Sequence, residues 1–349
     1  MSLTDTAFYT RRAINWTILG IIAYIVLKIF WSIFLTLFLI IFPPKLPPPN
    51  HAFGRLPSLK FPATATGSAQ LTFELQTIEG KVPPASASAN VYFMPKTAPN
   101  LLALNAAQEF ANRLLFNPAP VQENKNIYRF NDPELPLRRL RFDIVSGNFI
   151  VRYGFEQDPS IFIEKNFPAA DAMLLEAKNL LQQYDLSKED IDNGTPTVTF
   201  WRLSGTQLVP TSSLSQANAV RVDFFRAAIG STKIFPPNPD EAPVAIIFSG
   251  SANTKKRVLQ LAYTYWPIDL TTSATYGLIT SDEAWQKLQI GQGYIARRPA
   301  SGTLAVVRNV YLGYYDSLDA QTYLQPVFVF EGDNDFLAYV PAVSAPWTE

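Results

Sequence analysis

The 349-residue sequence contains no cysteine and only one histidine, His51. The lack of cysteine excludes a disulfide framework and thiol chemistry. A single histidine excludes zinc sites built from histidine and cysteine, and most histidine-based catalysis. The G-x-S-x-G, H-E-x-x-H and P-loop motifs are also missing. We therefore expect no cofactor and no enzymatic activity, although two carboxylates that meet in space would suffice for an envelope hydrolase.

The sequence has little charge and no excess of either sign. Lys and Arg together number 29, as do Asp and Glu, and charged residues make up 17% of the chain. A nucleic-acid-binding surface needs clustered basic residues that neutralise phosphates. The composition therefore argues against a nucleic-acid partner.

The longest apolar run covers residues 13–42 and is interrupted by one charge, Lys28. Roughly 20 helical residues, at about 1.5 Å each, cross a hydrocarbon core of about 30 Å. A signal peptide has a shorter apolar core of about 7–15 residues and a small-residue cleavage site, whereas this run ends in a proline-rich segment. The run therefore predicts an uncleaved single-pass membrane helix.

The basic residues that flank the run do not decide its orientation by themselves. Arg11 and Arg12 precede it, while Lys45, Arg55 and Lys60 follow it. The short leader of residues 1–12 and the lack of cysteine favour a signal anchor with a cytoplasmic N-terminus. We therefore expect the cell membrane as the location, with the bulk of the chain extracytoplasmic.

Lys28 has two interpretations. Lysine at mid-depth in a membrane helix costs about 2.5–3.5 kcal/mol on insertion scales. Its side chain can lower this cost by snorkelling towards the N-terminal interface. Alternatively, Lys28 pairs with a carboxylate or polar group on the membrane helix of a partner protein, which makes it the candidate partner-binding residue.

Beyond the run, residues 43–68 form a proline-rich linker that we expect to be extended and to leave His51 solvated. The residues after the linker predict an α+β fold, because apolar residues alternate in the expected strands and form stripes on the expected helices. Ser187 and Asp190 predict a capping box on a short turn that Gly194 ends. We expect helices at 101–116, 169–184 and 281–288, and strands at 71–78, 91–94, 127–130, 140–145, 149–155, 197–203, 219–227, 244–249, 259–266, 306–315, 323–331 and 336–340.

Two stretches, 71–93 and 198–225, each predict a strand, a loop of small residues and a second strand. This weak repeat suggests a duplication into two α+β units with antiparallel sheets, at residues 69–195 and 196–349. Short strand–loop–strand segments also converge easily, so the repeat alone does not establish common origin.

Acidic and aromatic residues supply the remaining candidate sites. Residues 190–194 resemble half of a calcium loop and residues 331–335 form an acidic turn, but both read more simply as turns. Aromatic residues gather on two predicted strands, where they either line a groove for peptide or glycan or pack in an aromatic-rich core. The candidate ligand-binding residues are Tyr263, Tyr265, Trp266, Tyr311, Tyr314 and Tyr315.

The C-terminal third carries a resemblance to a known family. The order of YWPID (265–269), SATYGLI (273–279), SDEAWQKLQIG (281–291), VYLGYY (310–315), LQPVFVFE (324–331) and AYVPA (338–342) resembles the extracytoplasmic regulators YycH and YycI. The helix before FDIVSGNFIV (142–151) looks like part of a PepSY module. The resemblance implies PepSY-like domains and a non-catalytic regulator of a bacterial sensor histidine kinase. The alternative is a wall-facing peptide- or glycan-binding module.

Overall fold

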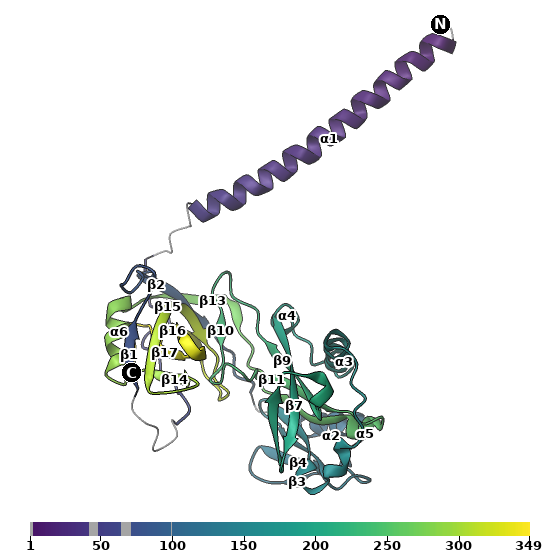
Figure 1. Ribbon diagram of the computed structural model, residues 1–349, viewed down its shortest axis with the longest axis vertical. Coiled ribbons are helices and arrows are strands. Elements are labelled where there is room, and N and C mark those ends of the chain that lie inside the picture. Colours follow the sequence, from purple (N-terminus) through teal and green to yellow (C-terminus); the bar gives the residue numbers. More distant parts are fainter. Residues whose placement is uncertain (1–2, 42–47, 64–70, 99) are drawn as a thin grey trace. The chain divides into compact units, whose positions relative to one another are not determined.

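The computed structural model describes residues 3–41, 48–63, 71–98 and 100–349. The chain divides into two compact units, Met1–Pro48 and Pro49–Glu349. The first unit contains one helix, and the second is an α+β body with two largely antiparallel sheets (Figure 1). The α+β fold class and the N-terminal apolar helix are therefore confirmed.

Helix α1 spans Leu3–Ile41. Residues 3–12, which belong to the short leader before the apolar run, are already helical, because the helix begins at Leu3. Once a helix is nucleated, each added residue gains a backbone hydrogen bond, so a long apolar helix readily extends into a polar flank. Within α1, the 23 residues Trp16–Phe38 are long and apolar enough to cross a membrane, and their side chains are exposed.

A nine-stranded antiparallel sheet forms the first half of the body. In spatial order its strands are β3 (Val121–Gln122), β4 (Ile127–Asn131), β5 (Arg138–Asp143), β6 (Phe149–Tyr153), β12 (Val258–Tyr263), β11 (Val244–Ser249), β9 (Ala219–Phe225), β7 (Thr195–Ser204) and β8 (Gln207–Thr211). Strands β5 and β6 form a hairpin, and Ser146, Gly147 and Asn148 lie in the turn between them.

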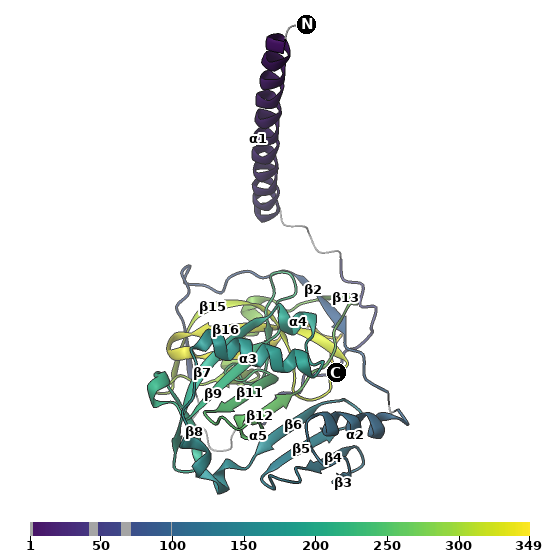
Figure 2. The ribbon, with the colours of Figure 1, turned by 90° about the vertical axis from the view of Figure 1, so that its right-hand side faces the viewer.

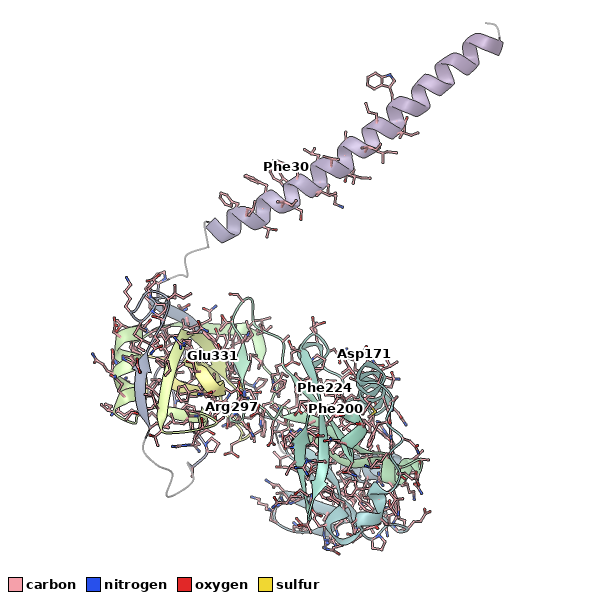
Figure 3. The ribbon with its side chains drawn as sticks, viewed as in Figure 1. Phe30, Asp171, Phe200, Phe224, Arg297 and Glu331 are labelled. Carbon is pink, nitrogen blue, oxygen red and sulfur yellow. The ribbon has the colours of Figure 1, made fainter. Side chains whose placement is uncertain are left out.

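Helices α2 (Ala103–Arg113) and α3 (Ala170–Gln183) cover one face of this sheet (Figure 2). Strand β9 shows why that face is apolar: Val220, Val222 and Phe224 point to the helices, and Arg221 and Asp223 alternate with them. Figure 3 labels Phe200 and Phe224 on the neighbouring strands β7 and β9. The short helix α4 (Glu189–Asp192) lies between α3 and β7 along the chain, and α5 (Thr254–Arg257) lies between β11 and β12.

An eight-stranded sheet forms the second half and is built around two long antiparallel strands, β15 (Leu304–Tyr315) and β16 (Tyr323–Gly332). The other strands are β1 (Thr72–Leu75), β2 (Ser88–Phe93), β10 (Ile234–Phe235), β13 (Asp269–Gly277), β14 (Tyr294–Arg297) and β17 (Leu337–Pro341). Strands β1 and β10 run parallel to β15, and the other pairings are antiparallel. Helix α6 (Ser281–Gln289) packs on β17, and Thr280 caps it by accepting from the amide of Glu283.

The sheets do not follow the predicted division at residue 195. Strand β12 pairs with β6 and strand β7 with β9, so strands from both sides of residue 195 share one sheet. Strands β1 and β2 instead belong to the eight-stranded sheet, together with the C-terminal strands. The stretch 71–93 does not match 198–225 in pairing either, because β1 and β2 do not pair with each other whereas β7 and β9 do. Pairing between distant strands overrides order along the chain.

The predicted linker also needs correction. Residues 43–47 and 64–68 lie outside the described residues, but the segment between them packs on the body. Leu56 is fully buried and its amide bonds to the carbonyl oxygen of Trp347, 2.8 Å away. The His51 ring stacks on Trp347, with centroids 3.9 Å apart, instead of being solvated. Apolar side chains of this proline-rich segment are therefore buried against the C-terminal part of the body.

Candidate functional site

Three of the six aromatic residues predicted to bind a ligand are buried. Tyr263, Tyr314 and Tyr315 are at most 6% exposed. Their hydroxyls donate hydrogen bonds to main-chain carbonyl oxygens: those of Leu186 (3.2 Å), Asn90 (3.0 Å) and Lys60 (3.3 Å), respectively. Burial and these bonds leave no face for a ligand, so the binding prediction was wrong for these three residues.

The other three aromatic residues are partly buried and also hold structural contacts. The Tyr311 hydroxyl donates to Glu331, 3.3 Å away. Tyr263 and Tyr265 pack in the core of the nine-stranded sheet, whereas Tyr311 and Tyr315 pack in the eight-stranded sheet. The two aromatic strands therefore do not line a common groove.

The structure instead brings four polar residues together where the two sheets join. We call Asp190, Arg226, Tyr265 and Asp316 the junction cluster. Arg226 follows β9 and its side chain is 2% exposed. Its Nε bonds to the Asp316 carboxylate (2.9 Å) and its Nη1 to the Asp190 carboxylate (3.0 Å). Asp316 follows β15, so this pair connects the nine-stranded sheet to the eight-stranded sheet.

Tyr265 and Trp266 complete the junction. The Arg226 guanidinium lies 4.6 Å from the ring centre of Tyr265, whose hydroxyl donates to Asp190 at 3.0 Å. Arg226 also donates to the main-chain oxygen of Trp266, and the Trp266 indole donates to the carbonyl of Leu318 at 3.1 Å. The resemblance motif YWPID therefore lies at the contact between the sheets, and it acts there as scaffold.

Helix α4 places Asp190 in this cluster. The predicted capping box is absent, since Lys188 is the N-cap and makes no side-chain cap bond. Gly194 is needed for another reason: a Cβ there would lie 1.8 Å from the carbonyl oxygen of Phe225. That close approach seats α4 against the end of β9, next to Arg226. Asp190, in the segment that resembles half of a calcium loop, is thus ion-paired with Arg226.

Asp316 is the most deeply buried carboxylate of the cluster. Burial raises the pKa of its carboxyl group, against the lowering effect of Arg226. Its Oδ1 atom is buried and has no hydrogen-bond partner among the described residues. A cleft of about 340 Å³ lies beside the cluster, with Asp190, Asn193 and Tyr265 on one side and Ile229, Ile234 and Ile268 among its apolar residues. The cluster's carboxylates are occupied by Arg226, which gives the cluster a connecting role.

The second acidic turn is engaged as well. Arg308 binds Asp333 through two nitrogens, at 2.6 and 2.9 Å. Arg308 and hydrogen bonding lower the pKa of Asp333. Within the described part of the chain, no group of three or more acidic or histidine side chains is placed to hold a metal ion.

Lys28, the predicted partner-binding residue, lies near the middle of Trp16–Phe38 and is exposed. It belongs to a regular pattern in this largely apolar segment. Gly20, Tyr24, Lys28, Ser32 and Thr36 follow one another at intervals of four residues. We call these five residues the four-residue stripe. The Thr36 hydroxyl donates to the Ser32 carbonyl at 2.9 Å, so that hydroxyl is satisfied within the helix.

Comparison with known proteins does not identify a family. No family model matches the chain, and no curated protein matches it. Among solved structures, the chain is similar to an uncharacterized protein from Eubacterium rectale ATCC 33656, with 12% sequence identity and a TM-score of 0.38. The match covers 72% of this chain and 82% of that chain. A similarity at this level assigns no activity.

Proposed function

We propose that the protein is a single-pass membrane protein that acts by binding a membrane partner through helix α1. The observation that carries this proposal is the four-residue stripe with Lys28 at its centre. The N-terminus would be cytoplasmic and Pro49–Glu349 extracytoplasmic. The exposed apolar side chains of Trp16–Phe38 support the anchor, because the bilayer would cover the surface that the chain itself leaves uncovered.

Residues four apart on a helix form a ridge that packs into the groove of a second helix. In lipid, apolar burial does not drive association, and interfaces instead use small residues and interhelical hydrogen bonds. Gly20 has no side chain, so the backbone of a partner helix can approach closely at this position. Lys28 and Ser32 provide donors for hydrogen bonds across the contact. The stripe extends over about 24 Å, at about 1.5 Å per residue.

The charge of Lys28 argues that the partner differs from this chain. Two copies packed in parallel through the stripe would bring two ammonium groups together in a medium of low dielectric. A helix with a carboxylate or amide oxygen at mid-depth would compensate the charge instead. The resemblance to YycH and YycI makes a sensor histidine kinase the first partner to test.

The test is recovery of membrane partners with the full chain. Lys28→Leu removes the charge and Gly20→Leu blocks close approach, whereas Ile29→Leu is the matched control beside the stripe. We expect both stripe variants to lose the partner and the control to retain it. Equal recovery with Lys28→Leu and wild type would contradict the proposal and favour snorkelling of the lysine side chain.

A second test separates anchoring from folding. Deleting residues 1–45 removes the anchor but leaves the Pro49–Glu349 unit and its own cores. We expect regulation of the partner to be lost while the circular-dichroism spectrum keeps its α+β character. Regulation that persists without the helix would count against a role for α1.

A further inference from the structure

An apolar groove opens on the nine-stranded sheet. It lies between helix α2, the turn that joins β5 to β6, and the residues after α3, and its volume is about 520 Å³. Clefts of roughly 300–1,000 Å³ with apolar walls and few polar groups are typical ligand sites. None of the aromatic residues chosen from sequence lines this groove.

The groove exists because one of its walls is made of small side chains. Ala103, Ala106 and Ala107 of helix α2 line it, and they are too short to fill the space above the sheet. Alanine is the strongest helix former, so the helix is stable without long side chains at these positions. Together they leave an open channel along this side of α2.

Aromatic rings form a second, aromatic wall of the groove, to which α2 itself contributes Phe110. The ring centre of Phe110 lies 5.6 Å from that of Phe142, 4.8 Å from Phe149 and 6.4 Å from Tyr184. Phe110, Phe142 and Tyr184 are half-buried, so parts of their rings are open to a ligand. Ring faces carry negative electrostatic potential and attract both apolar groups and cations.

One carboxylate at the rim of the groove has no ion-pair partner among the described residues. Arg113 pairs with Asp185 at 3.1 Å and lies 5.9 Å from the ring centres of Phe110 and Tyr184. Glu109 lines the groove, is exposed and forms no ion pair with any described residue. The rim is therefore complementary to a single positive charge next to an apolar group.

Exposed leucines extend the apolar surface at the start of α2. Leu101 is fully exposed and Leu102 is 64% exposed, and their neighbours Asn100 and Ala103 line the groove. Exposed apolar surface next to a pocket and rimmed by polar residues is characteristic of an interaction site. A ligand longer than the groove would find further contact there.

We propose that this groove binds a peptide segment of a partner protein in which an aromatic or aliphatic side chain stands next to Lys or Arg. The apolar side chain enters between the alanines of α2 and the aromatic wall, and the cation reaches Glu109. The unpaired Glu109 disfavours an anionic lipid headgroup, and the apolar walls offer few hydrogen bonds to a glycan. The inference is independent of helix α1 and of the membrane partner.

The test uses the full chain in detergent micelles and fluorescence anisotropy with three labelled pentapeptides. The probe is Gly-Phe-Lys-Leu-Gly, and the comparison peptides replace Lys with Glu or replace Phe and Leu with Ser. We expect the probe to bind at least about tenfold more tightly than either comparison peptide. Equal affinity for all three peptides, or binding of none, would overturn the proposal.

Matched variants place the binding in the groove. Ala106→Trp fills the channel from an exposed helix position, whereas Asn105→Trp puts the same side chain on α2 outside the groove. We expect the first to weaken probe binding by at least about tenfold and the second to leave it unchanged. Glu109→Lys should reverse the preference in favour of the Glu peptide. Equal binding by wild type and Ala106→Trp, or an unchanged preference with Glu109→Lys, would exclude this groove as the site.

Discussion

Charges are treated differently in the two units of the chain. In the described part of Pro49–Glu349, the buried charged side chains form three ion pairs: Asp132–Arg138, Arg221–Asp223 and Arg226–Asp316. Lys28 lies in an equally apolar stretch of α1 and pairs with no described residue. Removing a charge from water is costly unless a partner compensates it. The body supplies its own partners, whereas no described residue compensates the charge of Lys28 in α1.

The three pairs also differ from one another in what they connect. Asp132 and Arg138 flank one turn, and Arg221 and Asp223 lie two residues apart on β9. Arg226 and Asp316 come from different sheets. Local pairs stabilise one element, while the Arg226 pair depends on the fold of the whole body. Variants at these positions, and at Lys28, test the comparison.

The largest effect is expected from Arg226→Met. The substitution leaves Asp190 and Asp316 without their partner, and breaking a buried pair in this way costs about 3–5 kcal/mol. Denaturant unfolding of the full chain, followed by tryptophan fluorescence, measures the loss. Adding Asp316→Leu to Arg226→Met should recover part of it, because the uncompensated carboxylate is then gone. A loss below about 1 kcal/mol, the range of exposed pairs, would mean that the junction is solvated.

Two buried carboxylates should respond to pH in opposite directions. Burial opposes ionisation of Asp132, but the amides of Glu134 and Leu135 and the charge of Arg138 outweigh it and lower its pKa. Its stabilising contribution is present above the ordinary value of 3.8 and is lost as the pH falls through the lowered pKa. Burial raises the pKa of Asp316, so its contribution is present below 3.8 and is lost as the pH rises through the raised pKa.

Unfolding free energies measured against pH for Asp132→Asn and Asp316→Asn separate these contributions. We expect Asp132→Asn to flatten the loss of stability below pH 3.8, and Asp316→Asn to flatten a decline above it. The diagnostic quantity is the slope against pH, since either variant also lowers stability at every pH. Parallel curves for both variants and wild type would show that neither pKa differs between the folded and unfolded states.

Arg297→Met is the matched control for the junction pair. Arg297 also reaches a carboxylate from another part of the body, that of Asp240, whose side chain is 63% exposed. Exposed ion pairs contribute about 0–1 kcal/mol. The same denaturant experiment should therefore show a loss several-fold smaller than that of Arg226→Met. Similar losses for the two variants would indicate that burial does not distinguish these pairs.

The smallest effect on folding is expected from Lys28→Leu. Lys28 belongs to the other compact unit, Met1–Pro48, and independent sites add within about 0.3–0.5 kcal/mol. We expect the unfolding free energy of the body to change by less than about 0.5 kcal/mol in the same assay. A larger loss would show that Lys28 serves the fold of the body, and the contrast between the two units would then fail.

Most elements were predictable because their signal is local. The apolar helix shows as a continuous run of apolar residues. The β5–β6 hairpin and the long strands β15 and β16 show as alternation of apolar and polar residues over a short segment of sequence. The errors in strand pairing and in the linker share a cause, because both concerned contacts between distant segments. The repeat 71–93 was assigned to the wrong neighbours, and residues 48–63 were expected to be an exposed linker.

The candidate sites divide in the same way. Lys28 could be chosen from sequence, because a charge inside an apolar run stands out by itself. Tyr314 and Tyr315 were misjudged, because alternation shows that one face of a strand is buried but does not say which other strands cover the second face. Arg226 and Asp316 gave no signal, since nothing in either segment points to the other.

By itself, the sequence determined that an apolar helix precedes an α+β body without thiol chemistry, since composition and periodicity are properties of neighbouring residues. Only the tertiary structure decided which strands share a sheet, that the aromatic strands are buried, and that Arg226 meets Asp316 at the junction. The physical reason is that main-chain hydrogen bonds between strands are the same for every sequence. Register and partner are therefore chosen by the packing of side chains from the whole body.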